Sequence, residues 1–161
     1  MNKVLFLCDQ NFCGSRIAEI LFNHHAGPDS GGYQLTGWTA ESRGLELSNQ
    51  SGKRLSENAF QFLRERQINI LSLRWPLAVQ SADLLWADRI VALYEPAHRP
   101  LIEDRFPQWA NHVEFWNVPD FHLSDWQNAG PFIRMGPLAR LEANILELIS
   151  VIRSGERVTV R

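Results

Sequence analysis

Residues 4–19 read VLFLCDQNFCGSRIAE, and this stretch decides the fold. It opens on a continuous apolar run, VLFL, as expected of a strand that is buried on both faces of a sheet. Polar residues and a glycine follow, and helical spacing begins at Ser15, with Ile17, Ile20 and Leu21 on one face. The stretch therefore predicts a buried strand that runs through a short loop into a helix.

The alternation of strand and helix signals continues along the chain. The expected strands lie at 4–7, 38–42, 88–93 and 113–118, and the expected helices at 15–25, 55–67, 79–86, 96–105 and 138–152. Strands that alternate with helices predict an α/β fold, in which a parallel sheet carries helices on both faces.

Length and charge limit the function classes. The 161 residues suit one domain, which we expect over residues 1–153, followed by a polar tail at 154–161. The formal net charge of −2 leaves no basic excess for a nucleic-acid backbone, so a nucleic-acid partner is disfavoured. No run approaches the roughly 18 apolar residues that span a membrane, and the first apolar run is too short for a signal peptide. We therefore expect a cytoplasmic protein without a membrane partner.

Both cysteines of the chain, Cys8 and Cys13, lie in or at the edge of the loop after the first strand. Ligands of open parallel sheets bind beyond the carboxyl ends of the strands. Backbone N–H groups of such a loop, with the N-terminus of the next helix, can hold an anion and favour a thiolate. Cys8 is then a candidate nucleophile towards phosphorus. A cysteine at a strand end is equally often a small buried apolar residue, so both interpretations stay open.

The opening of the chain resembles that of the low-molecular-weight protein tyrosine phosphatases. That family begins with a strand of the form VLFVC, continues as C-x-G-N-x-C-R-S-P and carries A-E on the helix. The matching positions are Cys8, Asn11, Cys13, Ser15, Ala18 and Glu19. Segments at 41–44, 62–70, 82–93, 106–107 and 118–120 resemble later family landmarks in the same order. The resemblance implies a doubly wound, four-stranded parallel sheet.

The resemblance also implies a role for particular residues. Cys8 resembles the nucleophile that takes up the phosphoryl group, and Ser15 the hydroxyl that donates to its thiolate. Asn11 resembles the residue that fixes the strained loop, and Cys13 the second cysteine that can form a reversible disulfide with the nucleophile. Asp120 resembles the general acid, which protonates the leaving phenol and then activates water.

The phosphate-binding loop and the substrate follow from the same resemblance. The loop would comprise Asp9, Gln10, Asn11, Phe12, Cys13, Gly14 and Ser15. The substrate or partner would be a phosphorylated protein or a small phosphomonoester. The family requires no metal or other cofactor, and two cysteines on one loop are a poor zinc pattern.

The sequence departs from the family within that loop. Gly14 stands where the family has the arginine that grips the phosphoryl oxygens, Gln10 where it has glycine, and Arg16 where it has proline. Outside the loop, Leu73 replaces the histidine that supports the asparagine, and Phe121 replaces the proline after the acid. Asp125 is therefore an alternative acid.

Two arginines are candidates for the missing cation. Arg16 lies at the start of the helix, and Arg43 at the end of the second strand. A solvated surface position is the alternative for each, because arginine is mostly exposed.

Two functions stay open. The first is a phosphomonoesterase with a modified loop and weak or altered activity. The second is a catalytically inactive relative that binds phosphate or a phosphorylated partner. Thiol-based arsenate reduction, which occurs on the same fold, needs further redox cysteines, and no cysteine follows Cys13.

Overall fold

The computed structural model describes residues 1–48, 52–70, 73–119 and 131–159. Four parallel strands form one sheet: β1 (Asn2–Cys8), β2 (Trp38–Gly44), β3 (Arg89–Ala92) and β4 (Val113–Phe115). Their order is β2-β1-β3-β4, so the chain steps from β1 to one side and then to the other. This reversal puts the carboxyl end of β1 at the switch point, where open α/β sheets bind ligands. The predicted four-stranded parallel sheet is confirmed.

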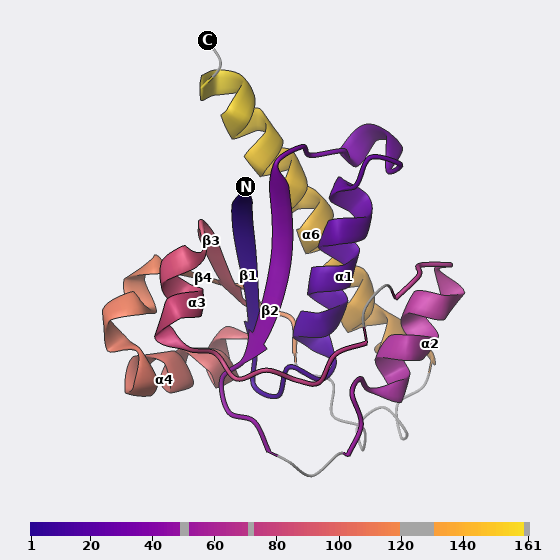
Figure 1. Cartoon of the computed structure of the whole chain (residues 1–161). Coiled ribbons are helices and arrows are strands. Elements are labelled where there is room, and N and C mark those ends of the chain that lie inside the picture. Colours follow the sequence, from indigo (N-terminus) through magenta and orange to yellow (C-terminus); the bar gives the residue numbers. More distant parts are fainter. Residues whose placement is uncertain (49–51, 71–72, 120–130, 160–161) are drawn as a thin grey trace.

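Helices cover both faces of the sheet (Figure 1). The α-helices are α1 (Gly14–Ala26), α2 (Glu57–Glu65), α3 (Ser81–Trp86), α4 (Glu95–Arg105) and α6 (Pro131–Thr159), and the 3-10 helices are η1 (Gly31–Tyr33) and η2 (Pro107–His112). α1 and α6 lie on one face, and α3 and α4 on the other. Among these described helices, none has the length and hydropathy that crossing a bilayer requires.

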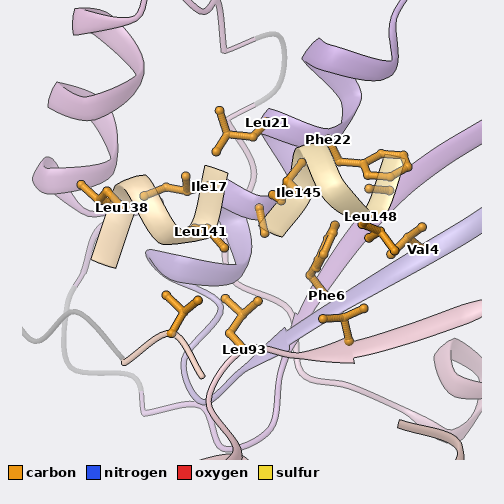
Figure 2. Packing of buried hydrophobic residues seen from close by; sticks show 14 of the residues in the cluster. Val4, Phe6, Ile17, Leu21, Phe22, Leu93, Leu138, Leu141, Ile145 and Leu148 are labelled. Atoms are coloured by element: carbon orange, nitrogen blue, oxygen red, sulfur yellow. The ribbon is translucent and has the colours of Figure 1, made fainter. Parts of the chain in front are cut away.

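β1 divides the core because its side chains alternate between the two faces. Val4, Phe6 and Cys8 belong to the cluster formed with α1 and α6. Figure 2 shows Val4 and Phe6 among apolar side chains of these two helices. Leu5 and Leu7 belong to the second cluster, which includes residues of α3 and α4. The alternation therefore turns Cys8 towards α1, the helix that the candidate loop enters.

The structure differs from the predictions mainly at the ends of elements. α2 begins at Glu57 rather than 55 because the Ser56 side chain accepts from the Ala59 amide as its N-cap. α6 continues to Thr159, whereas the sequence predicted a helix that ends at 152 and a polar tail over 154–161. A helix that is already packed extends readily, since each added residue gains a backbone hydrogen bond without a new nucleation step.

Candidate active site

The loop between β1 and α1 is anchored through its carbonyl groups. The Cys8 and Asp9 carbonyls accept from the Leu45 and Glu46 amides at 2.8 Å, and the Phe12 carbonyl accepts from Ser56 at 3.0 Å. These bonds join the loop to the ends of β2 and α2. Backbone hydrogen bonds to these flanking segments therefore fix the position of the loop.

Gly44 allows β2 to end directly against this loop. A Cβ at this position would lie 2.9 Å from the Asp9 carbonyl oxygen and 3.1 Å from the Asn11 amide nitrogen. Both neighbours are backbone atoms that cannot move aside cheaply. The close approach of the two segments therefore requires glycine at position 44.

Cys8 lies at the end of the central strand and is 2% exposed. Its Sγ lies 2.8 Å from the Ser15 Oγ, and the Asn11 backbone N–H donates to the same sulfur at 3.2 Å. A hydroxyl and an amide that point at sulfur stabilise a thiolate more than a thiol. The structure thus brings together the three predicted site residues Cys8, Asn11 and Ser15.

Asn11 is fully buried and uses its whole side chain to hold the loop. Its Nδ2 donates to the Oγ atoms of Ser15 and Ser42, both at 2.9 Å. Its Oδ1 accepts from Arg74 Nη1 at 2.9 Å and from the Leu77 amide at 3.0 Å. The backbone φ of 52° is left-handed, a conformation that asparagine tolerates better than most residues. Four hydrogen bonds to this amide group fix the strained turn.

Arg74 is the centre of this support. Its Nη2 donates to Glu19 Oε1 and to the Ser42 Oγ and carbonyl oxygen, each at 3.0 Å. Ser42 in turn donates to Glu19 Oε1 at 2.9 Å. Neither Arg74 nor Ser42 is among the residues that the sequence singles out for the site. Both reach the loop from segments far away along the chain.

The other loop positions have distinct surroundings. Gln10 has no positive φ, and its Oε1 accepts from the Ser48 amide and hydroxyl at 2.8 and 3.1 Å. Asp9 Oδ1 accepts from the Gln10 amide at 2.9 Å. Gly14 is the buried first residue of α1 and offers no side chain to an anion. Cys13 is 7% exposed and precedes α1 as its N-cap residue.

Arg16 is buried beside the loop, with 1% of its surface exposed. Its Nη1 donates to the Arg54 carbonyl at 2.9 Å, while its buried Nε has no hydrogen-bond partner among the described residues. Burial and, next, the charge of Arg74 lower the pKa of Arg16 from its usual value to about 10, against the opposing charges of Glu19 and Cys8. A shift of this size corresponds to roughly 3 kcal/mol against the charged form at neutral pH, from burial and from the charge of Arg74 together.

Arg43, the second candidate cation, is engaged elsewhere. Its Nε lies 3.3 Å from Asp83 Oδ1, and its Nη2 lies 3.7 Å from Glu41 Oε2. Because side chains alternate along β2, Arg43 faces α3 while its neighbour Ser42 faces α1. The structure thus brings Arg16, and not Arg43, to the loop.

The predicted acids Asp120 and Asp125, with Phe121, lie outside the described residues. Within the described part of the chain, no group of three or more His, Cys, Asp or Glu side chains could hold a metal ion.

The family model described as low molecular weight phosphotyrosine protein phosphatase matches residues 3–131. The chain belongs to this family. No curated protein sequence matches the chain.

Solved structures of this phosphatase family share the fold over nearly the whole chain. The YwlE arginine phosphatase from Geobacillus stearothermophilus is 20% identical, with a TM-score of 0.73 and coverage of 97% of this chain and 96% of that one. A low molecular weight protein tyrosine phosphatase from T. tengcongensis is 23% identical, with a TM-score of 0.71 and coverage of 93% and 99%. YfkJ from Bacillus subtilis is 20% identical, with a TM-score of 0.76 and coverage of 96% of each chain. At these identities the likeness establishes the fold.

The resemblance to the low-molecular-weight phosphatases places the support of the asparagine at position 73, whereas Arg74 resembles a basic residue outside the loop with a structural role. Leu73, which by resemblance stands at the position of the supporting histidine, is 40% exposed. The next residue, Arg74, reaches Asn11 Oδ1 through its Nη1. In this structure Arg74 therefore supports the Asn11 side chain.

Proposed function

We propose that this chain hydrolyses phosphate monoesters of the phosphotyrosine type through a phosphocysteine on Cys8. The observation that carries the proposal is the sulfur of Cys8 at the switch point, with the Ser15 hydroxyl at 2.8 Å and the Asn11 amide at 3.2 Å. The family model supports a phosphatase function, since it describes phosphatases that act on phosphorylated protein.

The proposed reaction has two displacements at phosphorus. The Cys8 thiolate attacks, an S–P bond forms, and the P–O bond to the phenol breaks while the leaving oxygen takes a proton from Asp120. Asp120, with Asp125 as the alternative, then removes a proton from the water that cleaves the S–P bond. The products are a phenol and inorganic phosphate, and the thiolate is restored.

The proposed oxyanion cradle is the loop from Asp9 to Ser15. Its carbonyl groups at 8, 9 and 12 bond outward to flanking segments, and it leads into the N-terminus of α1. Loop amides and first-turn N–H groups would then bind the phosphoryl oxygens. Asn11 keeps the loop in this shape, and Arg74 keeps Asn11 in place.

A second candidate is a relative that binds phosphate without turnover. Gly14 favours it, because the arginine that the family carries there stabilises the transferring group in the transition state. Comparable arginines contribute roughly 10³–10⁵-fold to phosphoryl transfer.

The test measures the initial rate of p-nitrophenyl phosphate hydrolysis by the wild-type chain and by Cys8→Ser. Phosphoarginine serves as a second substrate, because one similar structure is an arginine phosphatase. We expect the wild-type chain to hydrolyse the aryl phosphate. The Cys8→Ser variant should stay folded and lose this activity. Equal rates in the two proteins would overturn the phosphocysteine. A wild-type chain that turns over neither substrate, but whose melting temperature rises with phosphate, would establish the second candidate instead.

A further inference from the structure

Arg16 presents an unusual combination of deep burial and few partners. Its side chain is 1% exposed, one nitrogen donates to the Arg54 carbonyl, and the buried Nε donates to nothing among the described residues. Buried polar groups are nearly always hydrogen-bonded, and buried charges are nearly always paired. An orphaned guanidinium nitrogen beside a candidate anion site therefore points to a ligand.

The charges around Arg16 support the same conclusion. Glu19 is the carboxylate of this region, and it is bonded to Arg74 at 3.0 Å and to Ser42 at 2.9 Å. Among the described residues, no carboxylate lies within ion-pair distance of Arg16. The neighbouring Arg74 charge and burial both lower the pKa of Arg16, whereas the charge of Cys8 raises it. The region thus has a surplus of positive charge next to the nucleophile.

We propose that Arg16 supplies the positive charge for a phosphoryl dianion bound in the loop, in place of the arginine that the family carries at Gly14. The inference rests on the proposed function, because it takes the loop as the oxyanion site. Residues 14 and 16 do not share a helix face, so Arg16 approaches from the side of Arg54. It therefore acts through its charge rather than through the two-pronged grip of a loop arginine.

The test measures binding of inorganic phosphate by titration calorimetry in a Cys8→Ala background, where no covalent intermediate forms. Arg16→Met should weaken phosphate binding at least about ten-fold, the scale of one charge-assisted interaction. Arg16→Lys keeps the charge and should bind within about three-fold of the parent. Arg43→Met is the matched control and should bind as the parent does, since Arg43 pairs with Asp83 on the other face.

The melting temperature of Arg16→Met without phosphate distinguishes a ligand-binding arginine from a purely structural one, because the two roles predict changes of opposite sign. Removing an unneutralised buried charge should raise the melting temperature of Arg16→Met, whereas losing a structural arginine would lower it. Parent-like phosphate binding by Arg16→Met would overturn the inference. So would a loss of binding in Arg16→Lys as large as that in Arg16→Met, or a lower melting temperature.

The outcomes also separate this inference from the proposed function. Suppose that turnover depends on Cys8 but that Arg16→Met binds phosphate as the parent does. The proposed phosphatase activity would then be supported, and the proposed role of Arg16 would be overturned. A Cys8→Ala parent that binds no phosphate would overturn the loop as an oxyanion site, and the inference with it.

Discussion

Two arginines, Arg74 and Arg16, lie beside the same loop. The more exposed one, Arg74, has many hydrogen-bond partners, and the more buried one, Arg16, has few. Arg74 keeps 25% of its side chain exposed, yet its guanidinium donates to Asn11, Glu19, Ser42 and Trp75. Arg16 is 1% exposed and donates to one carbonyl. A buried cation with a structural role usually has several hydrogen-bond or ion-pair partners, because these offset the cost of removing the charge from water. The difference indicates that Arg74 builds the loop and that Arg16 is held ready for a ligand.

The largest expected effect on stability is that of Arg74→Met. Loss of the guanidinium removes one of the two donors to Asn11 Oδ1 and the ion-pair partner of the partly buried Glu19 carboxylate. The free energy of unfolding should fall by about 2–3 kcal/mol, measured by urea denaturation. Arg89→Met is the matched control: its partner is Glu114 in an exposed pair, so its loss should be below about 1 kcal/mol. Equal losses in the two variants would mean that Arg74 does not build the loop.

Arg16→Met should act in the opposite direction and should depend on pH. Below about pH 10 the folded state carries the full penalty of the buried charge, because the pKa of about 10 in the folded state lies below the pKa of arginine in the unfolded chain. Between those values the unfolded state binds more protons, so the stability of the wild-type chain rises with pH. Arg16→Met should therefore be more stable by roughly 1–3 kcal/mol at neutral pH, with a smaller gap at about pH 11.

Urea denaturation of the wild type and Arg16→Met at the two pH values measures this gap. A gap that stays constant would show that the advantage of methionine does not come from the charge. A less stable Arg16→Met would place Arg16 with Arg74 as a structural residue.

The smallest expected effect is that of Arg43→Met. Arg43 pairs with Asp83 and Glu41 near the surface, so its loss should lower the free energy of unfolding by about 0.5–1 kcal/mol. Its rate of aryl phosphate hydrolysis should equal that of the wild type, measured at saturating and at low substrate. A fall in that rate would mean that the guanidinium facing α3 acts on the loop as well.

The sequence predicts the fold and the contact between Cys8 and Ser15 well because their signals are local. The apolar run at 4–7, the loop and the helical spacing after Ser15 lie within one short stretch, and the structure places Cys8 and Ser15 in contact. Element ends are less predictable, since capping and packing decide them, as Ser56 does for α2 and as the length of α6 shows.

The support of the loop could not be predicted from the sequence. Ser42 and Arg74 are 31 and 63 positions from Asn11, and no local pattern connects them. Arginine is mostly exposed, so nothing in the sequence indicates that Arg16 is buried while Arg43 faces the opposite side of the sheet. These placements follow from the strand order and from the alternation of side chains along β2.

The most direct test of the account is to look for the phosphoryl group on Cys8. The wild-type chain is mixed with an excess of aryl phosphate, quenched during turnover and digested, and the peptide that carries Cys8 is weighed by mass spectrometry. The account predicts that this peptide gains the mass of one phosphoryl group, and that the Cys8→Ala peptide does not. An unmodified Cys8 peptide, or a phosphoryl group on any other residue, would contradict it.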